Sequence, residues 1–147
     1  MTQNVIISIM VKQDYEDQEA ELMELVTHGV MEEEKGSFKI SYEETEMTGL
    51  GGTTTTFLVQ EDKIVLTREG TVRSYMQFEE GRRHNSIYDT PYGTMDVEVH
   101  TTAFSQNITP VGGEITLDYN IEISKTIVGN NFFQIKVALP KEKQPLS

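Results

Sequence analysis

The sequence contains no cysteine, which excludes disulfide bonds and thiolate metal ligands and agrees with a reducing compartment. Basic residues are scarce as well. Only 12 lysines and arginines stand against 24 aspartates and glutamates, so the net charge is −12. Such a surface repels nucleic-acid phosphates and anionic lipids. We therefore expect neither nucleic acid nor a membrane surface among the partners.

Long apolar runs are also missing. The apolar segment at residues 5–11 has seven residues, whereas a membrane helix needs about 20. No basic segment precedes it and no small-residue cleavage site follows, so we predict no signal peptide and a cytoplasmic location. The chain length predicts a single domain over residues 1–147, with residues 141–147 as a frayed tail.

What the sequence does have is a two-residue hydrophobic period, which is clean at residues 94–103. One face carries Met95, Val97, Val99, Thr101 and Ala103, and the other carries Thr94, Asp96, Glu98, His100 and Thr102. This alternation is typical of a strand with one buried and one solvated face. The same pattern predicts further strands at residues 4–12, 37–44, 53–61, 63–68, 71–79, 83–88, 114–123 and 130–139, with an extended segment at 104–109.

The segment 21–33 is ambiguous. Leu22, Leu25 and Val26 have helical spacing, but Thr27, Gly29 and Val30 disfavour a helix interior. We predict a long strand with a bend or bulge at Gly29. Turns are predicted at Lys35-Gly36, Glu61-Asp62, Glu69-Gly70 and Gly129-Asn130.

About ten strands with short links predict an all-β fold, because parallel neighbours require long crossovers. A sandwich and a barrel both satisfy the pattern. Consecutive hairpins favour a single closed or nearly closed antiparallel up-and-down barrel of about 8–10 strands. The bulky residues expected inside leave little room, although a barrel of this size accommodates one small ligand. They are Phe38, Tyr42, Phe78, Tyr119 and Phe133.

Five motifs in order resemble the YwiB-like family, a bacterial family of uncharacterised lipocalin-like (calycin-type) β-barrel proteins with a domain of unknown function. The resemblance spans nearly the whole chain and implies a small cytoplasmic barrel with an apolar interior and no assigned chemistry. It also implies a buried arginine that caps one end of the barrel, for which Arg68 and Arg73 are the candidates. The motifs are Glu24-Leu25-Val26-Thr27-His28-Gly29, Ser41-Tyr42-Glu43-Glu44, Thr67-Arg68-Glu69-Gly70, Tyr88-Asp89-Thr90-Pro91-Tyr92-Gly93 and Gly112-Gly113-Glu114-Ile115.

The residues 88–93 form the most distinctive of these motifs. Pro91 and Gly93 explain it as a tight turn, and a turn at a barrel mouth is a place where ligands are gated. We therefore predict ligand-binding residues at the mouth or in the lumen: Tyr42, Arg73, Tyr88, Tyr92 and Tyr119.

Two other groups are weaker candidates. Asp96, Glu98 and His100 share one strand face, but alternate residues lie about 7 Å apart and a solvated outer face explains them better than a metal site. The glycines at 49–52 precede a strand and lack a P-loop pattern, so a phosphate site is not predicted. No metal and no cofactor are expected.

No nucleophile-elbow or HExxH motif is present, so we do not predict an enzyme. Two functions remain. The first is binding of a small apolar molecule in the lumen. The alternative is a non-enzymatic structural or protein-interaction module with a filled core, acting as a homodimer or through its acidic surface.

Overall fold

The computed structural model describes residues 2–15, 18–44, 51–91, 93–123 and 126–140, and these contain ten strands. No helix in these ranges is long and apolar enough to cross a membrane. The strands are β1 (Thr2–Tyr15), β2 (Gln18–Glu34), β3 (Ser37–Glu43), β4 (Thr54–Val59), β5 (Ile64–Glu69), β6 (Arg73–Phe78), β7 (Arg83–Thr90), β8 (Gly93–Gln106), β9 (Gly112–Ile123) and β10 (Thr126–Ala138).

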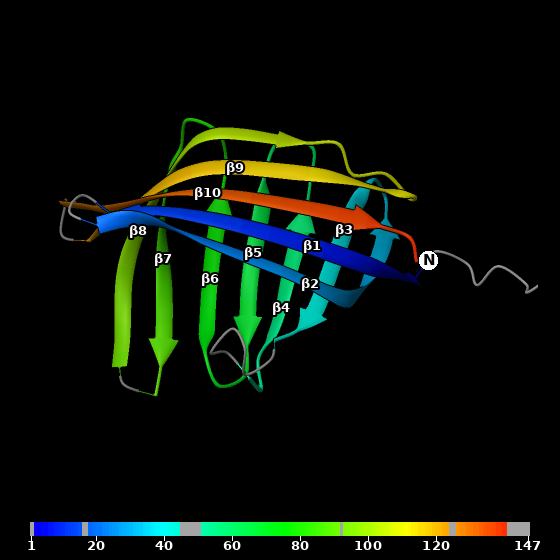
Figure 1. The fold of residues 1–147 in the computed structure, drawn as a ribbon, viewed down its shortest axis with the longest axis horizontal. Helices are drawn as coiled ribbons and strands as arrows, with labels where there is room; N and C mark the ends of the chain where they lie inside the picture. The colour runs from blue at the N-terminus through cyan, green and yellow to red at the C-terminus, as the bar shows by residue number, and fades with distance from the viewer. Residues whose placement is uncertain (1, 16–17, 45–50, 92, 124–125, 141–147) are drawn as a thin grey trace, which may run out of the picture.

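Each strand pairs antiparallel with its neighbours in sequence, and β1 pairs with β10 to close the barrel. The closing register runs from Ile6 opposite Ala138 to Asp14 opposite Asn130. In Figure 1 the long strands β1, β2, β9 and β10 cross the shorter strands β3 to β6 at a steep angle. The predicted all-β, closed, antiparallel up-and-down barrel is confirmed.

β8 turns the corner between these two sets of strands. Its first half pairs with β7 and its second half with β9, and Figure 1 shows it curving from one to the other. A register shift between Thr101 and Ala103 marks a β-bulge, which bends a strand and breaks its alternation. Phe104, opposite Leu117, consequently packs against the core, and the predicted inward position of Ala103 is wrong.

Two glycine predictions also need correction. Gly129 and Asn130 lie inside β10 beside a register shift, and therefore do not form the predicted turn. Gly29 pairs in register with Val5, without a bulge. A Cβ at this glycine would clash with Ile7 Cδ1 and would lie 2.6 Å from the Ser41 carbonyl oxygen. Close packing therefore requires glycine at position 29.

The interior is built of side chains in register across β3 to β6. Ile40, Phe57, Leu66 and Met76 form one apolar layer, and Phe38, Val59, Ile64 and Phe78 form the next. Long strands cover them with Ile7, Ile9, Ile115, Leu117, Phe133 and Ile135. Of the five bulky residues predicted inside, four are buried, and Tyr119 is partly buried against the core.

Candidate functional site

A polar layer follows the apolar ones at one end of the barrel. Tyr42 pairs with Thr55, Thr55 with Arg68, and Arg68 with Ser74, so the four side chains lie side by side on adjacent strands. They occupy the inward positions of these strands, where Tyr42, Thr55 and Ser74 are buried and Arg68 is partly buried. Glu44, one step further along the chain from β3, is also buried.

Hydrogen bonds tie part of this layer together. The Thr55 hydroxyl donates to the Glu44 carboxylate over 2.8 Å. Burial raises the pKa of Tyr42 far above its ordinary value of 10.0, and the neighbouring Glu44 carboxylate, which accepts a hydrogen bond from the tyrosine hydroxyl, raises it further. Arg68 acts on the pKa of Tyr42 in the opposite direction, which places its positive charge close to the same hydroxyl.

The other part of the layer lacks partners. Among the described residues, five buried polar side-chain atoms form no hydrogen bond, and three of them lie on this wall of the lumen: Arg68 Nε, Ser74 Oγ and Ser86 Oγ. Ser74 is 8% exposed and Ser86 is 1% exposed. Ser74 pairs with Tyr88 on β7, and Ser86 lies two residues before Tyr88. The two serines are therefore diagonal neighbours.

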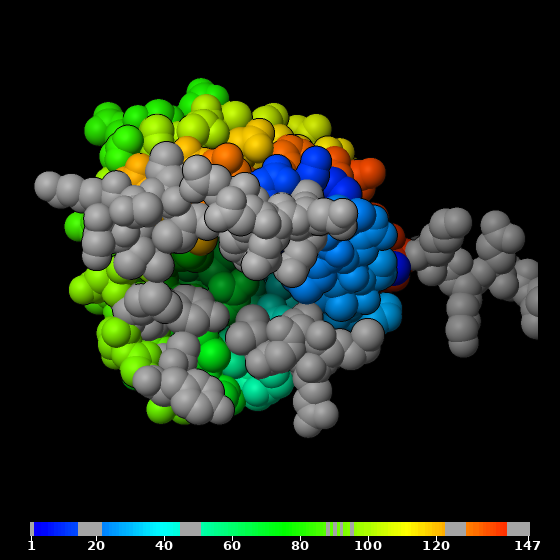
Figure 2. Space-filling model, turned by 60° about the vertical axis from the view of Figure 1, so that its left-hand side comes forward, coloured from blue at the N-terminus to red at the C-terminus, as the bar shows by residue number. Residues whose placement is uncertain are grey.

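This wall lies behind an opening. The face of the molecule in Figure 2 is hollowed at its centre, and the bottom of the hollow shows the green of β5 and β6. Arg68 and Ser74 are the inward polar residues of these two strands. The hollow therefore opens toward the two strands that carry Arg68 and Ser74.

The structure does not bring all the predicted ligand-binding residues together. Tyr42 belongs to the polar layer, where its ring stacks on Phe57 at 6.2 Å between centroids. Tyr119 packs instead on Phe78, 4.8 Å away. Phe78 lies four residues from Ser74 along β6, or about 13 Å, so Tyr119 sits at the other end of the interior. The side chain of Tyr88 and the whole of Tyr92 lie outside the described residues.

Arg73 faces away from the lumen. Its side chain is exposed and lines an open groove of about 450 Å³, together with Glu69, Tyr75, Ile87 and Asp89 and with Arg68 and Ser74 of the polar layer. Tyr75 and Ile87 lie opposite each other here and are about half exposed. The arginine that shares the interior with Tyr42 is Arg68.

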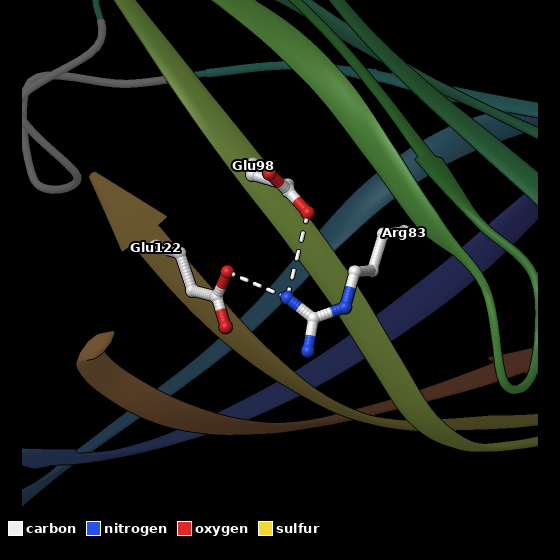
Figure 3. A network of polar contacts seen from close by, with 3 residues as sticks. All are labelled: Arg83, Glu98 and Glu122. Atoms are coloured by element: carbon white, nitrogen blue, oxygen red, sulfur yellow. Dashed lines mark hydrogen bonds and ion pairs between the residues drawn. The ribbon is translucent and has the colours of Figure 1, made fainter. Parts of the chain in front are cut away.

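The trio Asp96, Glu98 and His100 remains on the outer face. Glu98 lies directly opposite Glu122, and Arg83 reaches both carboxylates (Figure 3). Its Nη1 is 2.7 Å from Glu122 Oε2 and 3.5 Å from Glu98 Oε1. The arginine thus offsets the repulsion between two adjacent carboxylates. No group of three potential metal ligands occurs in the described part of the chain.

Sequence reasoning missed the grouping of Glu44, Arg68 and Ser74 with Tyr42. The signal was the same alternation that predicts the strands. Glu44 continues the inward series of Phe38, Ile40 and Tyr42, and Arg68 continues that of Ile64 and Leu66. What alternation does not provide is the register that sets these positions beside one another.

Fold and site together define a closed ten-stranded antiparallel β-barrel with one polar end to its interior. The model of a family described as "Domain of unknown function (DUF1934)" matches residues 7–135, and the chain belongs to this family. Its structure is similar to that of the ywiB protein from Bacillus subtilis, with a TM-score of 0.82. The two share 18% sequence identity, over 95% of this chain and 94% of that one.

The predicted resemblance to the YwiB-like family is therefore confirmed. At this identity the solved structure supports the fold alone. A comparison with curated proteins found no match.

Proposed function

We propose that the barrel binds a small, largely apolar molecule in its lumen, at the end lined by Tyr42, Arg68 and Ser74. One observation carries the proposal: Arg68 Nε and the hydroxyls of Ser74 and Ser86 are buried without hydrogen-bond partners on a single wall. Each such group costs about 1–3 kcal/mol of stability. A ligand that supplies partners recovers this free energy when it binds.

The rest of the site suits the same kind of molecule. Phe57, Leu66 and Met76 form the apolar layer next to the polar one, so an apolar body rests on them while its polar group meets Arg68 and Ser74. Ligand sites of this kind are mostly apolar, with a few polar groups that fix orientation.

Native mass spectrometry of protein purified from its source organism tests the proposal. We expect one small molecule per chain, released under denaturing conditions. The double variant Ser74→Ala/Ser86→Ala should lose the bound molecule and yet unfold at an equal or higher urea concentration, because it removes two unsatisfied hydroxyls. Ser105→Ala, at an exposed position, is the control and should change neither. A ligand-free monomer, or a molecule that the double variant retains, contradicts the proposal.

A second candidate function is self-association, and it rests on β2. Pairing with β3 begins only at Val30, opposite Ser41. Before that point Leu22, Met23 and Val26 are 60%, 49% and 69% exposed. A ligand-free dimer in the same mass spectra, dissociated by Val26→Lys, supports this alternative.

A further inference from the structure

We infer that the molecule bound in the lumen carries an anionic group, such as a carboxylate or a sulfonate, and that Arg68 binds this group. The inference rests on the proposed function, because it names the chemistry of a ligand at the same site. It goes beyond that function by assigning a charge to the ligand and a binding role to one residue.

Arg68 supplies a positive charge at this wall of the lumen. A guanidinium stays protonated in proteins and has five N–H donors. Arg68 occupies an inward position on β5, and its Nε is buried with no acceptor. No carboxylate of the described residues forms an ion pair with it. A cation held partly out of water without an ion-pair partner favours an anion at that point.

Glu44 does not serve as the ion-pair partner of Arg68. It is the nearest buried carboxylate along the layer, but Thr55 donates a hydrogen bond to it, and so does Tyr42. The two hydroxyls hold this carboxylate on the β3–β4 side of the layer. The unpartnered atoms of Arg68, Ser74 and Ser86 lie on the β5–β7 side.

The Ser74 hydroxyl provides a second hydrogen-bond donor beside Arg68. Ser74 lies directly opposite Arg68 on β6, at a cross-strand separation of about 5 Å between Cβ atoms. A guanidinium and a hydroxyl at this spacing converge on the oxygens of one small anionic group, and charge-assisted bonds of this kind are among the strongest in proteins. The apolar part of the ligand then extends over Phe57 and Met76.

Two fluorescent probes that differ by a single group provide the test. 1-Anilinonaphthalene-8-sulfonate carries a sulfonate, and N-phenyl-1-naphthylamine is the same molecule without it. In fluorescence titrations we expect the wild-type protein to bind the sulfonate probe about tenfold more tightly or better. Arg68→Gln should remove this preference and leave the affinity for the neutral probe within about threefold. Arg68→Lys should retain part of the preference.

Arg82→Gln is the matched control, since it makes the same charge change at an exposed position between β6 and β7 and should leave both affinities unchanged. Circular dichroism establishes that each variant is folded. Equal affinity of the wild-type protein for both probes, or an unchanged preference in Arg68→Gln, overturns the anionic ligand while the lumenal site stands. Failure of both probes to bind contradicts the lumenal site as well.

Discussion

Tyr42 shows how one buried residue connects the stability of the barrel with its polar layer. The ring belongs to the core through Phe57, whereas the hydroxyl interacts with the charges of Glu44 and Arg68. Burial and the Glu44 carboxylate both favour the protonated hydroxyl, so the pKa of Tyr42 is higher in the folded protein than in the unfolded chain. The folded state therefore holds this proton more tightly.

Linkage turns this difference into a pH dependence. Because the folded pKa is raised, the contribution of Tyr42 is fully present below the unfolded pKa of about 10 and is lost as the pH rises above it. We expect the wild-type protein to lose about 1 kcal/mol more stability than Tyr42→Phe between pH 9 and pH 11. Urea unfolding of both proteins at these pH values measures the difference. Parallel losses in the two proteins would contradict the role of the buried hydroxyl.

At the scale of the strand, local chemistry predicts much of the fold. Lys35 and Gly36 have φ angles of 52° and 83°, as the predicted tight turn requires. Alternation places Ile115 and Leu117 inside correctly. It fails at Ala103, because a bulge depends on how β8 bends between two neighbours and leaves no mark in the local pattern. The predicted turn at Gly129 is wrong for a related reason, since glycine favours turns and irregular strand positions alike.

The same limit applies to the candidate site. Alternation with Phe38 and Ile40 predicts that Tyr42 points inward, whereas Arg68 and Ser74 become neighbours only through the register of β5 with β6. The family resemblance makes Arg73 a candidate for the buried arginine, although its position one residue from Ser74 puts it on the opposite face.

Adjacent phenylalanines in β10 test the register directly. Phe133 is 7% exposed and packs on Phe57, while Phe132 lies on the outer face. We expect Phe133→Ala to lower the free energy of unfolding by about 3–5 kcal/mol, because it opens a cavity in the core. Phe132→Ala should cost about 1 kcal/mol. Chemical denaturation measures both, and equal losses would show that β10 pairs one residue out of the register described.

At the scale of the whole molecule, the central feature is closure. The first and last strands have no short connection, and their own sequences do not predict that they pair. The curvature of all ten strands brings them together. In Figure 1 the start of β1 and the end of β10 lie at the same end of the barrel. Closure leaves no open edge between these two strands, which suits an all-β chain of this length.

Circular permutation tests this closure. Thr2 lies four residues, or about 13 Å, beyond the pairing of Ile6 with Ala138, and a Gly-Ser linker of about six residues from Pro140 to Thr2 spans this gap. New ends between Glu61 and Asp62 fall in an exposed hairpin closed by the Gln60–Lys63 hydrogen bond.

We expect this permutant to fold, with a free energy of unfolding within about 2 kcal/mol of the wild-type value, because every strand pair is preserved. The control permutant opens β9 between Leu117 and Asp118, where Leu117 is 2% exposed, and should not fold, since the cut divides a core strand. Urea unfolding followed by circular dichroism measures both. A hairpin permutant that stays unfolded would contradict the pairing of β1 with β10, because only that pairing brings the joined ends within reach of the linker.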